Sequence, residues 1–202
     1  MRKILLPQLR NEVLMDADFS IELGADDPVL DFPWTDPAGK LTYVDLKRHP
    51  ESIATIEEAQ KFPELRECLR ILNSPTSMVE TAKCDAWTTT ELSADEEIYN
   101  ASHKYASYVD VLFSNIDARL SFPAHEQFVR KLVALLRRAP ETPSAAEVCV
   151  RRCYFAEDRG VQEGFCCTLY VSGYGSEEAS ARLNWGVGLK LVGNAIVQLS
   201  RP

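Results

Sequence analysis

The amino-acid sequence predicts an α+β fold: an antiparallel four-stranded sheet with helices on one face, preceded by an irregular acidic N-terminal arm. From residue 51 onward, apolar residues at helical spacing and at period two alternate in the order αββ-αββ-α. Residues 1–50 lack such a pattern and contain several turn-forming clusters. We therefore expect a single domain, in which an arm (1–50) packs on an α+β body (51–202).

The arm contains two strand candidates. Residues 13–23 carry several apolar side chains and precede residues 24–28, a Gly-Ala-Asp-Asp-Pro cluster that is typical of a turn. Residues 41–46 are the second candidate, and they end before the break at His49 and Pro50. The remainder of the arm is expected to be loop that its aromatic residues hold against the body.

The first half of the body begins with Leu65, Leu69 and Leu72, which recur at the spacing of a helix. Residues 76–89 and 104–114 then alternate with period two, which predicts two half-buried strands. In the first of these strands, we expect one face to hold Met78, Ala82, Cys84 and Ala86, and the other to hold Thr81, Lys83, Asp85 and Trp87.

The second half repeats this order. Residues 121–138 have an apolar stripe that predicts a helix, ended by Pro140 and Pro143. Residues 147–155 and 164–173 are strand candidates joined by a turn at 157–160. The sequences of the two halves are not similar enough to show a duplication.

The last segment, 176–200, fits two structures. Trp185, Val187, Leu189 and Leu191 alternate, and Gly193 followed by Asn194 is able to turn a hairpin. As a helix capped by Ser176, the same segment places an apolar stripe at spacings of 4, 3, 4 and 3, comprising Trp185, Leu189, Val192, Ile196 and Leu199. We favour the helix, with Gly186 and Gly193 on this stripe allowing the sheet to approach closely.

Charge is spread unevenly along the chain. Residues 1–100 hold 10 Lys+Arg and 20 Asp+Glu, a net of −10, whereas residues 101–202 hold 12 and 10, a net of +2. The acidic half opposes attraction to nucleic acid or to an anionic membrane, so we expect neither as a partner. The first apolar run is too short for a signal peptide and no membrane span is found, which predicts a cytoplasmic protein.

The six cysteines are best explained by core packing. No CxxC occurs, and Cys149, Cys153, Cys166 and Cys167 have no histidine nearby in the sequence. Cys153 is expected opposite Cys166 or Cys167 in the 147–173 hairpin. We expect no bound cofactor.

A weak metal site is predicted in the acidic loop of the arm. Asp26, Asp27 and Asp31 supply carboxylate oxygens of the kind that hard cations such as Ca²⁺ prefer. The spacing matches no EF-hand, and aspartates next to glycine and proline also stabilise turns. The turn is the competing interpretation, and it is favoured.

Two groups of residues are candidates for ligand binding. Trp87, Asp85 and Lys83 share one strand face and are able to line a pocket, although a core anchor is the favoured interpretation of Trp87. Arg130 and Arg137 are seven residues apart on one helical face, where they are able to hold a phosphate or carboxylate. The same arginines can instead pair with the acidic arm or lie on a solvated helix face.

No catalytic frame such as GxSxG, HExxH or a phosphate-binding loop is present. The leading hypothesis is a non-enzymatic interaction or small-ligand-binding domain that forms a homodimer through its sheet or last helix, with a small anionic molecule as a possible ligand. The alternative is a hydrolase-type or metal-dependent enzyme. Its acidic site would lie between arm and sheet and use Asp or Glu with His103 or His125.

Overall fold

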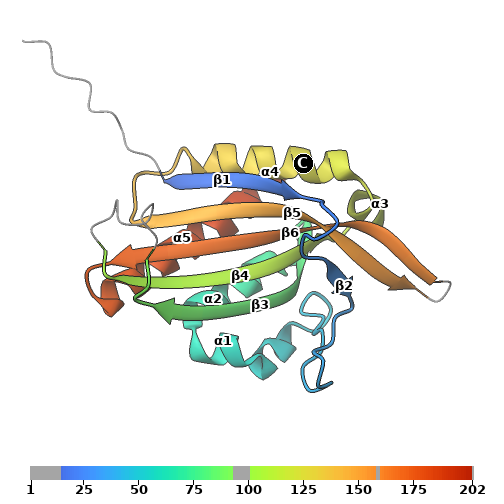
Figure 1. The fold of residues 1–202 in the computed structure, drawn as a ribbon, viewed down its shortest axis with the longest axis horizontal. Coiled ribbons are helices and arrows are strands. Elements are labelled where there is room, and N and C mark those ends of the chain that lie inside the picture. Colours follow the sequence, from blue (N-terminus) through green and yellow to red (C-terminus); the bar gives the residue numbers. More distant parts are fainter. Residues whose placement is uncertain (1–14, 93–100, 158–159, 202) are drawn as a thin grey trace, which may run out of the picture.

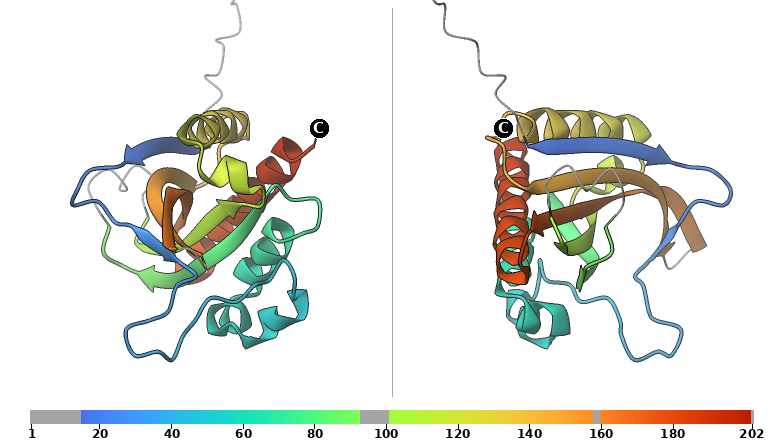
Figure 2. Two further views of the ribbon diagram at one scale, coloured as in Figure 1. Left: turned by 90° about the vertical axis from the view of Figure 1, so that its right-hand side faces the viewer. Right: turned by 60° about the vertical axis from the view of Figure 1, so that its left-hand side comes forward.

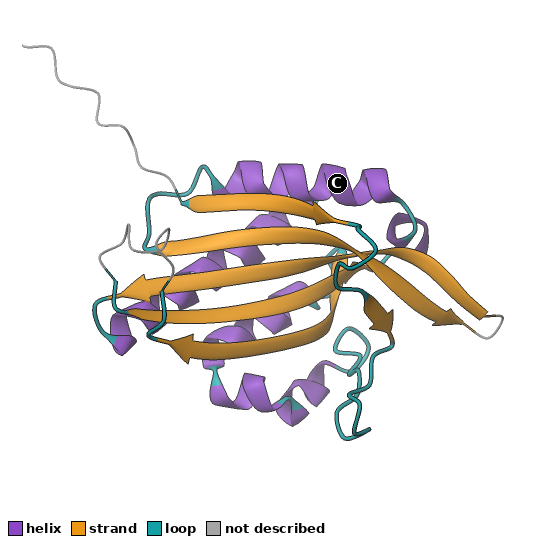
Figure 3. Cartoon of the chain, viewed as in Figure 1, coloured by secondary structure: helices purple, strands orange, loops and turns teal. Residues whose placement is uncertain are grey.

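The computed structural model describes residues 15–92, 101–157 and 160–201. The chain folds into a mixed α+β domain, an open six-stranded sheet with helices packed on one face (Figure 1, Figure 3). The strands are β1 (Asp16–Glu22), β2 (Leu30–Phe32), β3 (Val79–Thr89), β4 (His103–Phe113), β5 (Ser144–Glu157) and β6 (Gly160–Gly175). The helices are the 3-10 helix η1 (Pro50–Thr55), α1 (Glu57–Lys61), α2 (Pro63–Leu72), α3 (Ile116–Arg119), α4 (Phe122–Leu136) and α5 (Glu178–Leu199).

The predicted order of elements in the body is confirmed. Helices α1 and α2 precede the β3–β4 pair, α3 and α4 precede the β5–β6 pair, and α5 closes the chain. These four strands pair antiparallel in the order β5-β6-β4-β3. The period-two patterns and helical stripes of the sequence therefore located the four strands and the three longer helices of the body, but not the short helices η1, α1 and α3.

The prediction of a purely antiparallel, four-stranded sheet is wrong, because the arm supplies two further strands. Strands β1 and β2 lie end to end along the outer edge of β5, and both run parallel to it. β1 fits this edge because its alternating pattern buries Ala17 toward the helices and leaves Asp18 exposed. The predicted strand at 41–46 is not formed, and only an isolated bridge joins Thr35 to Thr42.

A β-bulge changes the predicted faces of β3. Thr81 pairs with Val111 and Lys83 pairs with Asp110, so Ala82 has no partner in β4. Thr81 consequently points toward the helices, where its hydroxyl accepts from Asn73 (2.7 Å), and Ala82 points to the opposite face. The predicted faces for these two residues were reversed, whereas those after the bulge agree with the pairing.

Helix α5 confirms the helical interpretation of the last segment. Its Trp185 is fully buried, and the indole Nε1 donates to Ser107 Oγ on β4 (2.9 Å). The cap is Glu177, whose carboxylate forms a capping box with Ser180, rather than the predicted Ser176.

Gly186 and Gly193 of α5 do not have the predicted role of admitting the sheet. Gly186 faces Glu64 and Gly193 faces Ile71, and both of these neighbours belong to α2. The close approach of helix and sheet occurs at Gly173 of β6, where a Cβ would lie 2.0 Å from the backbone nitrogen of Trp185.

The main core lies between the sheet and helices α2, α4 and α5. The opposite side of the sheet is called the open face here, and the arm crosses one end of it (Figure 2). A second, smaller core fixes the arm there by packing Leu30 and Phe32 against Cys153, Phe155 and Cys166. None of the described helices combines the length and apolar character needed to cross a membrane.

Candidate functional site

A row of polar side chains crosses the open face from one edge of the sheet to the other. Arg151 on β5 donates through Nε to Glu22 Oε2 on β1 (2.7 Å) and through Nη1 to Thr168 Oγ1 on β6 (3.2 Å). The Thr168 hydroxyl in turn donates to Asp110 Oδ1 on β4 (2.6 Å). Asp110 is the register partner of Lys83 on β3, so five strands each contribute one member.

Asp110 is the most buried charged member of this row, with 8% of its surface exposed. Burial raises the pKa of its carboxyl, against the opposing effects of the Thr168 hydroxyl and the positive charges of Arg151 and Lys83. A buried carboxyl with a perturbed pKa lowers stability unless it is fully compensated, and such groups cluster at functional sites.

Aromatic rings run alongside the polar row. The Tyr108 ring lies 6.5 Å from that of Trp87 and 6.3 Å from that of Tyr170, measured between centroids. The Lys83 ammonium lies 5.2 Å from the Trp34 ring and 5.9 Å from the Tyr108 ring. Two rings therefore flank the Lys83 charge, which also interacts electrostatically with the Asp110 carboxyl.

A small hollow of about 180 Å³ lies over this row, beneath the arm. Its lining combines three residues of the arm with seven of the sheet, namely Pro28, Val29, Leu30, Lys83, Tyr108, Asp110, Arg151, Cys166, Thr168 and Tyr170.

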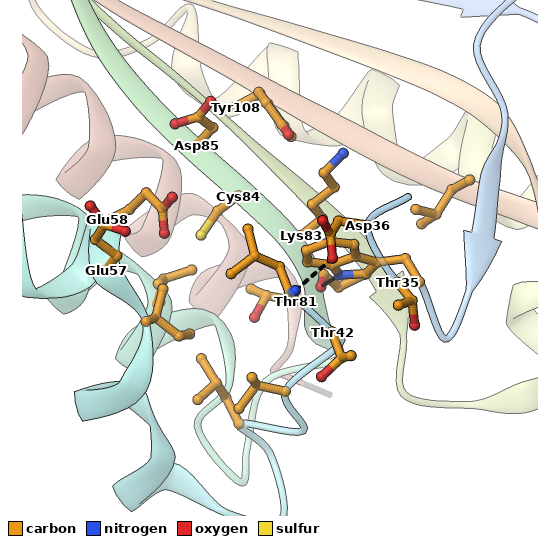
Figure 4. A pocket seen from close by; sticks show the side chains of 18 of the residues that line it. Thr35, Asp36, Thr42, Glu57, Glu58, Thr81, Lys83, Cys84, Asp85 and Tyr108 are labelled. Carbon is orange, nitrogen blue, oxygen red and sulfur yellow. Dashed lines mark hydrogen bonds between the residues drawn. The ribbon is translucent and has the colours of Figure 1, made fainter. Parts of the chain in front are cut away.

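A larger cavity of about 600 Å³, the arm cleft, adjoins the hollow and lies between the arm, the start of α1 and β3 (Figure 4). The two share Val29, Leu30, Lys83 and Tyr108. The lining includes one amine and five carboxyl groups, a formal net charge of −4. They belong to Lys83, Asp31, Asp36, Glu57, Glu58 and Asp85. Its apolar lining includes Trp34, Leu41, Val44, Ile56 and Leu69.

Local hydrogen bonds explain how the arm forms one wall of the cleft. The Asp36 carboxylate accepts from the backbone N–H of Leu41 (2.6 Å) and of Ala38 (3.2 Å), which folds 36–41 into a turn. The Leu41 hydrogen bond is also the largest cause of the lowered pKa of Asp36. Trp34 then donates through Nε1 to the Ala82 carbonyl (2.7 Å), which attaches the arm to β3.

The structure brings together three of the predicted ligand-binding residues. Lys83, Asp85 and Trp87 share the open face, and the first two line the arm cleft. Trp87 is 40% exposed, so its interpretation as a core anchor is wrong. Its exposed ring instead extends the aromatic row.

Arg130 and Arg137 do not join this group, because they lie on α4 beside β1, at the other edge of the sheet. Arg130 pairs with Glu126 (2.8 Å). Arg137 donates to the Ala17 carbonyl (2.7 Å) and to Asp18 (3.3 Å). Arg137 therefore matches the predicted alternative in which an arginine ties the arm to the body, whereas the exposed pair of Arg130 matches the alternative of a solvated helix face.

The predicted metal site gains no support from the arrangement of the arm. Within residues 15–92, 101–157 and 160–201, no three or more His, Cys, Asp or Glu side chains are placed to hold a metal ion, so Asp26, Asp27 and Asp31 do not converge. Asp27 accepts from the Gly24 N–H, as in the turn that the sequence favoured.

All six cysteines are unpaired thiols, and five of them are buried. Cys153 lies opposite Gly164, not opposite Cys166 or Cys167 as predicted, because Glu157 pairs with Gly160 and counting back from that pair places residues 153 and 164 together. Burial raises the pKa of Cys149 to about 11 and that of Cys68 to about 12, so these thiols stay protonated at neutral pH.

Sequence reasoning missed most of the polar row and the acidic wall of α1. For Asp110, the available signal was an aspartate inside the apolar run 109–113. Arg151 and Thr168 gave no such signal, since their partners come from strands more than ten residues away.

Comparison of the chain with protein-family models, with curated proteins and with solved structures gives no match.

Proposed function

We propose that this protein is a small-ligand-binding domain, and that its ligand combines an apolar body with a positive charge and binds in the arm cleft. The observation that carries the proposal is the cleft itself, a cavity of about 600 Å³ with an apolar lining and a net charge of −4. Ligand pockets in proteins typically measure about 300–1,000 Å³ and combine apolar walls with a few polar groups.

The charge of the cleft favours a cation over the anion expected from the sequence. Glu57 and Glu58 stand on the α1 side and Asp85 on the β3 side, so a positive group in the cleft meets carboxylates from both walls (Figure 4). The rings of Trp34 and Tyr108 already flank one ammonium group, that of Lys83, and they supply faces on which an apolar or cationic ligand can stack.

The chemistry of the lining favours binding over catalysis. No histidine is among the residues that line the cleft; His125 is buried between α4 and β4, and His103 contacts Ser102. The cleft contains one thiol, Cys84, and burial together with the Glu58 charge raises its pKa to about 12. A protonated thiol without a neighbouring base is a poor nucleophile.

Three ligands of the same shape test the sign of the charge. We expect 3-phenylpropylamine to raise the melting temperature of the protein and to bind in calorimetry, whereas 3-phenylpropionate and 3-phenylpropanol bind at least about tenfold more weakly. Equal binding of the amine and the carboxylate would contradict the proposal, and so would the absence of binding by all three.

Variants locate the binding to the cleft. Replacing both Glu57→Gln and Glu58→Gln should weaken amine binding by at least about fivefold, a loss of about 1 kcal/mol, because two charges leave the wall. The matched control is Glu126→Gln with Glu141→Gln, which removes the same charge from outside the cleft and should leave binding unchanged. Equal effects of the two pairs would place the ligand elsewhere.

Self-association remains part of the proposal. The glycines of α5 contact α2 and the sheet of the same chain, so they give no support to a dimer formed through this helix. The open face, with its exposed Trp87, is the surface left for a second copy. Light scattering at two concentrations tests this, and a mass of 22.7 kDa at both would exclude the homodimer.

A further inference from the structure

We infer that the outer edge of β3 binds an extended basic peptide, which adds a strand to the sheet beside the arm cleft. The inference rests on the proposed function, because it names the class of cationic ligand that the cleft takes. β3 is the last strand of the sheet on this side, and residues 81–85 follow one another along the cavity wall. Consecutive strand residues line a cavity when the backbone edge borders it, since side chains alternate between faces.

Two hydrogen bonds show which backbone groups of β3 point away from the sheet. The Ala82 carbonyl accepts from the Trp34 indole on the arm (2.7 Å), and the Ala86 N–H donates to the side chain of Asp85 (2.7 Å). The partners of both groups lie outside the ladder with β4. Ala82 and Ala86 therefore direct these groups toward the outer edge.

The alternation of a strand extends this result to the residues between and beyond them. The register of β3 is continuous after the bulge, and Cys84 and Thr88 have the same parity as Ala86, so their N–H and C=O groups also point outward. Within the part of the chain that the structure describes, no strand pairs with this stretch of β3. The 84–88 edge thus presents outward backbone groups at the spacing that a further strand requires, and at Ala86 a carbonyl of the added strand would replace the Asp85 side chain as the acceptor.

The first half of β3 is closed, which fixes where a peptide begins. Lys47 Nζ donates to the carbonyls of Ser77 (2.6 Å) and Val79 (2.7 Å), and the Thr81 N–H donates to Asn73 Oδ1 (3.0 Å). The bulge follows directly. Lysines, bulges and covering segments are the usual devices that protect an edge strand, and on β3 they stop at the start of the open stretch.

Charge then selects the kind of peptide. The carboxylates of Glu57, Glu58 and Asp85 lie beside the open edge, against the single amine of Lys83. In strand addition the backbone supplies affinity and alternate side chains supply specificity. Lysine or arginine at alternate positions would meet the α1 wall, and apolar residues between them would meet the aromatic row.

Amide hydrogen exchange on the full chain tests the inference. The probe is a short peptide of alternating lysine and valine, blocked at both ends. We expect it to slow exchange of the Cys84, Ala86 and Thr88 amides by about tenfold or more. The same peptide with every backbone amide N-methylated keeps its charges but loses its donors, and it should give no protection. 3-Phenylpropylamine, which has no strand to add, should give none either.

The outcomes separate this inference from the proposed function. Binding of the amine without protection by the peptide overturns strand addition and leaves the small-ligand site intact. Protection by the peptide without amine binding overturns the small-ligand proposal and supports the peptide site. Equal protection by the plain and N-methylated peptides overturns the inference. Replacing both Glu57→Gln and Glu58→Gln should weaken binding of the plain peptide by at least about fivefold. The control pair, Glu126→Gln with Glu141→Gln, should leave that binding unchanged.

Discussion

The closest contact between a helix and the sheet predicts a large effect of one methyl group. An alanine Cβ at position 173 of β6 would lie 2.0 Å from the backbone nitrogen of Trp185 and 2.6 Å from the carbonyl oxygen of Ala181. Ordinary contact begins at 3.4 Å, so α5 must move away by about 1.4 Å. Because these neighbours are backbone atoms, no change of side-chain rotamer relieves the overlap in Gly173→Ala.

The magnitude follows from two opposing effects. Overpacking costs about 1–3 kcal/mol and more where backbone is involved, so a cost of about 3 kcal/mol is expected. Replacing glycine by alanine stabilises a strand by about 0.5–1 kcal/mol through the unfolded state. The net loss is about 2 kcal/mol, which corresponds to a fall in melting temperature of about 4–8 °C in a chain of this size. Urea and thermal unfolding followed by circular dichroism measure both.

Gly186→Ala on α5 is the matched control. Its added Cβ would meet Glu64 Cγ at 3.0 Å, so this side chain, whose carboxylate is held by Arg182, must shift by a few tenths of an ångström, and alanine is favoured over glycine in a helix by about 1 kcal/mol. The control should therefore keep or raise the melting temperature. If Gly173→Ala is as stable as Gly186→Ala, α5 does not cross the sheet at Gly173 and the reasoning is refuted.

Three further predictions concern titratable groups. Burial lowers the pKa of His125, whose Nδ1 donates to the Ser121 carbonyl (2.9 Å), so the free energy of unfolding should fall as pH drops below about 6.5. His125→Asn keeps a donor for that carbonyl, and its free energy of unfolding, measured in urea, should depend less steeply on pH. An equal pH dependence in the variant and the wild type would exclude a neutral buried imidazole. Because the pKa of Asp110 is raised in the folded protein, the free energy of unfolding of the wild type should fall as pH rises above about 4. Asp110→Asn lacks this titration, so its stability relative to the wild type should increase as pH rises toward 7. A constant difference across this range would contradict a buried charge there. Ellman's reagent should react slowly with the native protein, whereas in denaturant it should react with all six cysteines. A thiol that reacts fast in the native protein would show that Cys84, the one cysteine that is not fully buried, is not protected as described.

Local patterns were sufficient to place the elements of the body. The spacing of Leu65, Leu69 and Leu72 predicted α2, and the alternation in 104–114 predicted β4. In the last segment, 176–200, the stripe that contains Trp185 favoured a helix over a hairpin, and α5 has that structure. Each of these features depends on residues close in sequence, because burial on one side imposes a period of 3.6 or 2.

The candidate site was only partly accessible to the same reasoning. Lys83, Asp85 and Trp87 were recognised as sharing a face, because they lie on one strand after the bulge. Their neighbours Asp110 and Arg151 come from other strands, and the register that aligns them is set by pairing across the sheet. The cleft requires in addition that Trp34 of the arm reach Ala82, a contact between residues 48 positions apart.

The sequence by itself determined the class of fold, the order of elements in the body and the acidic character of the first half, because composition and periodicity are properties of neighbouring residues. Only the tertiary structure decided that the arm joins the sheet as β1 and β2, that the bulge exchanges the faces of Thr81 and Ala82, and that five carboxylates and one lysine line the same cleft. These features depend on parallel pairing and on contacts between distant segments, whose partners no local pattern specifies.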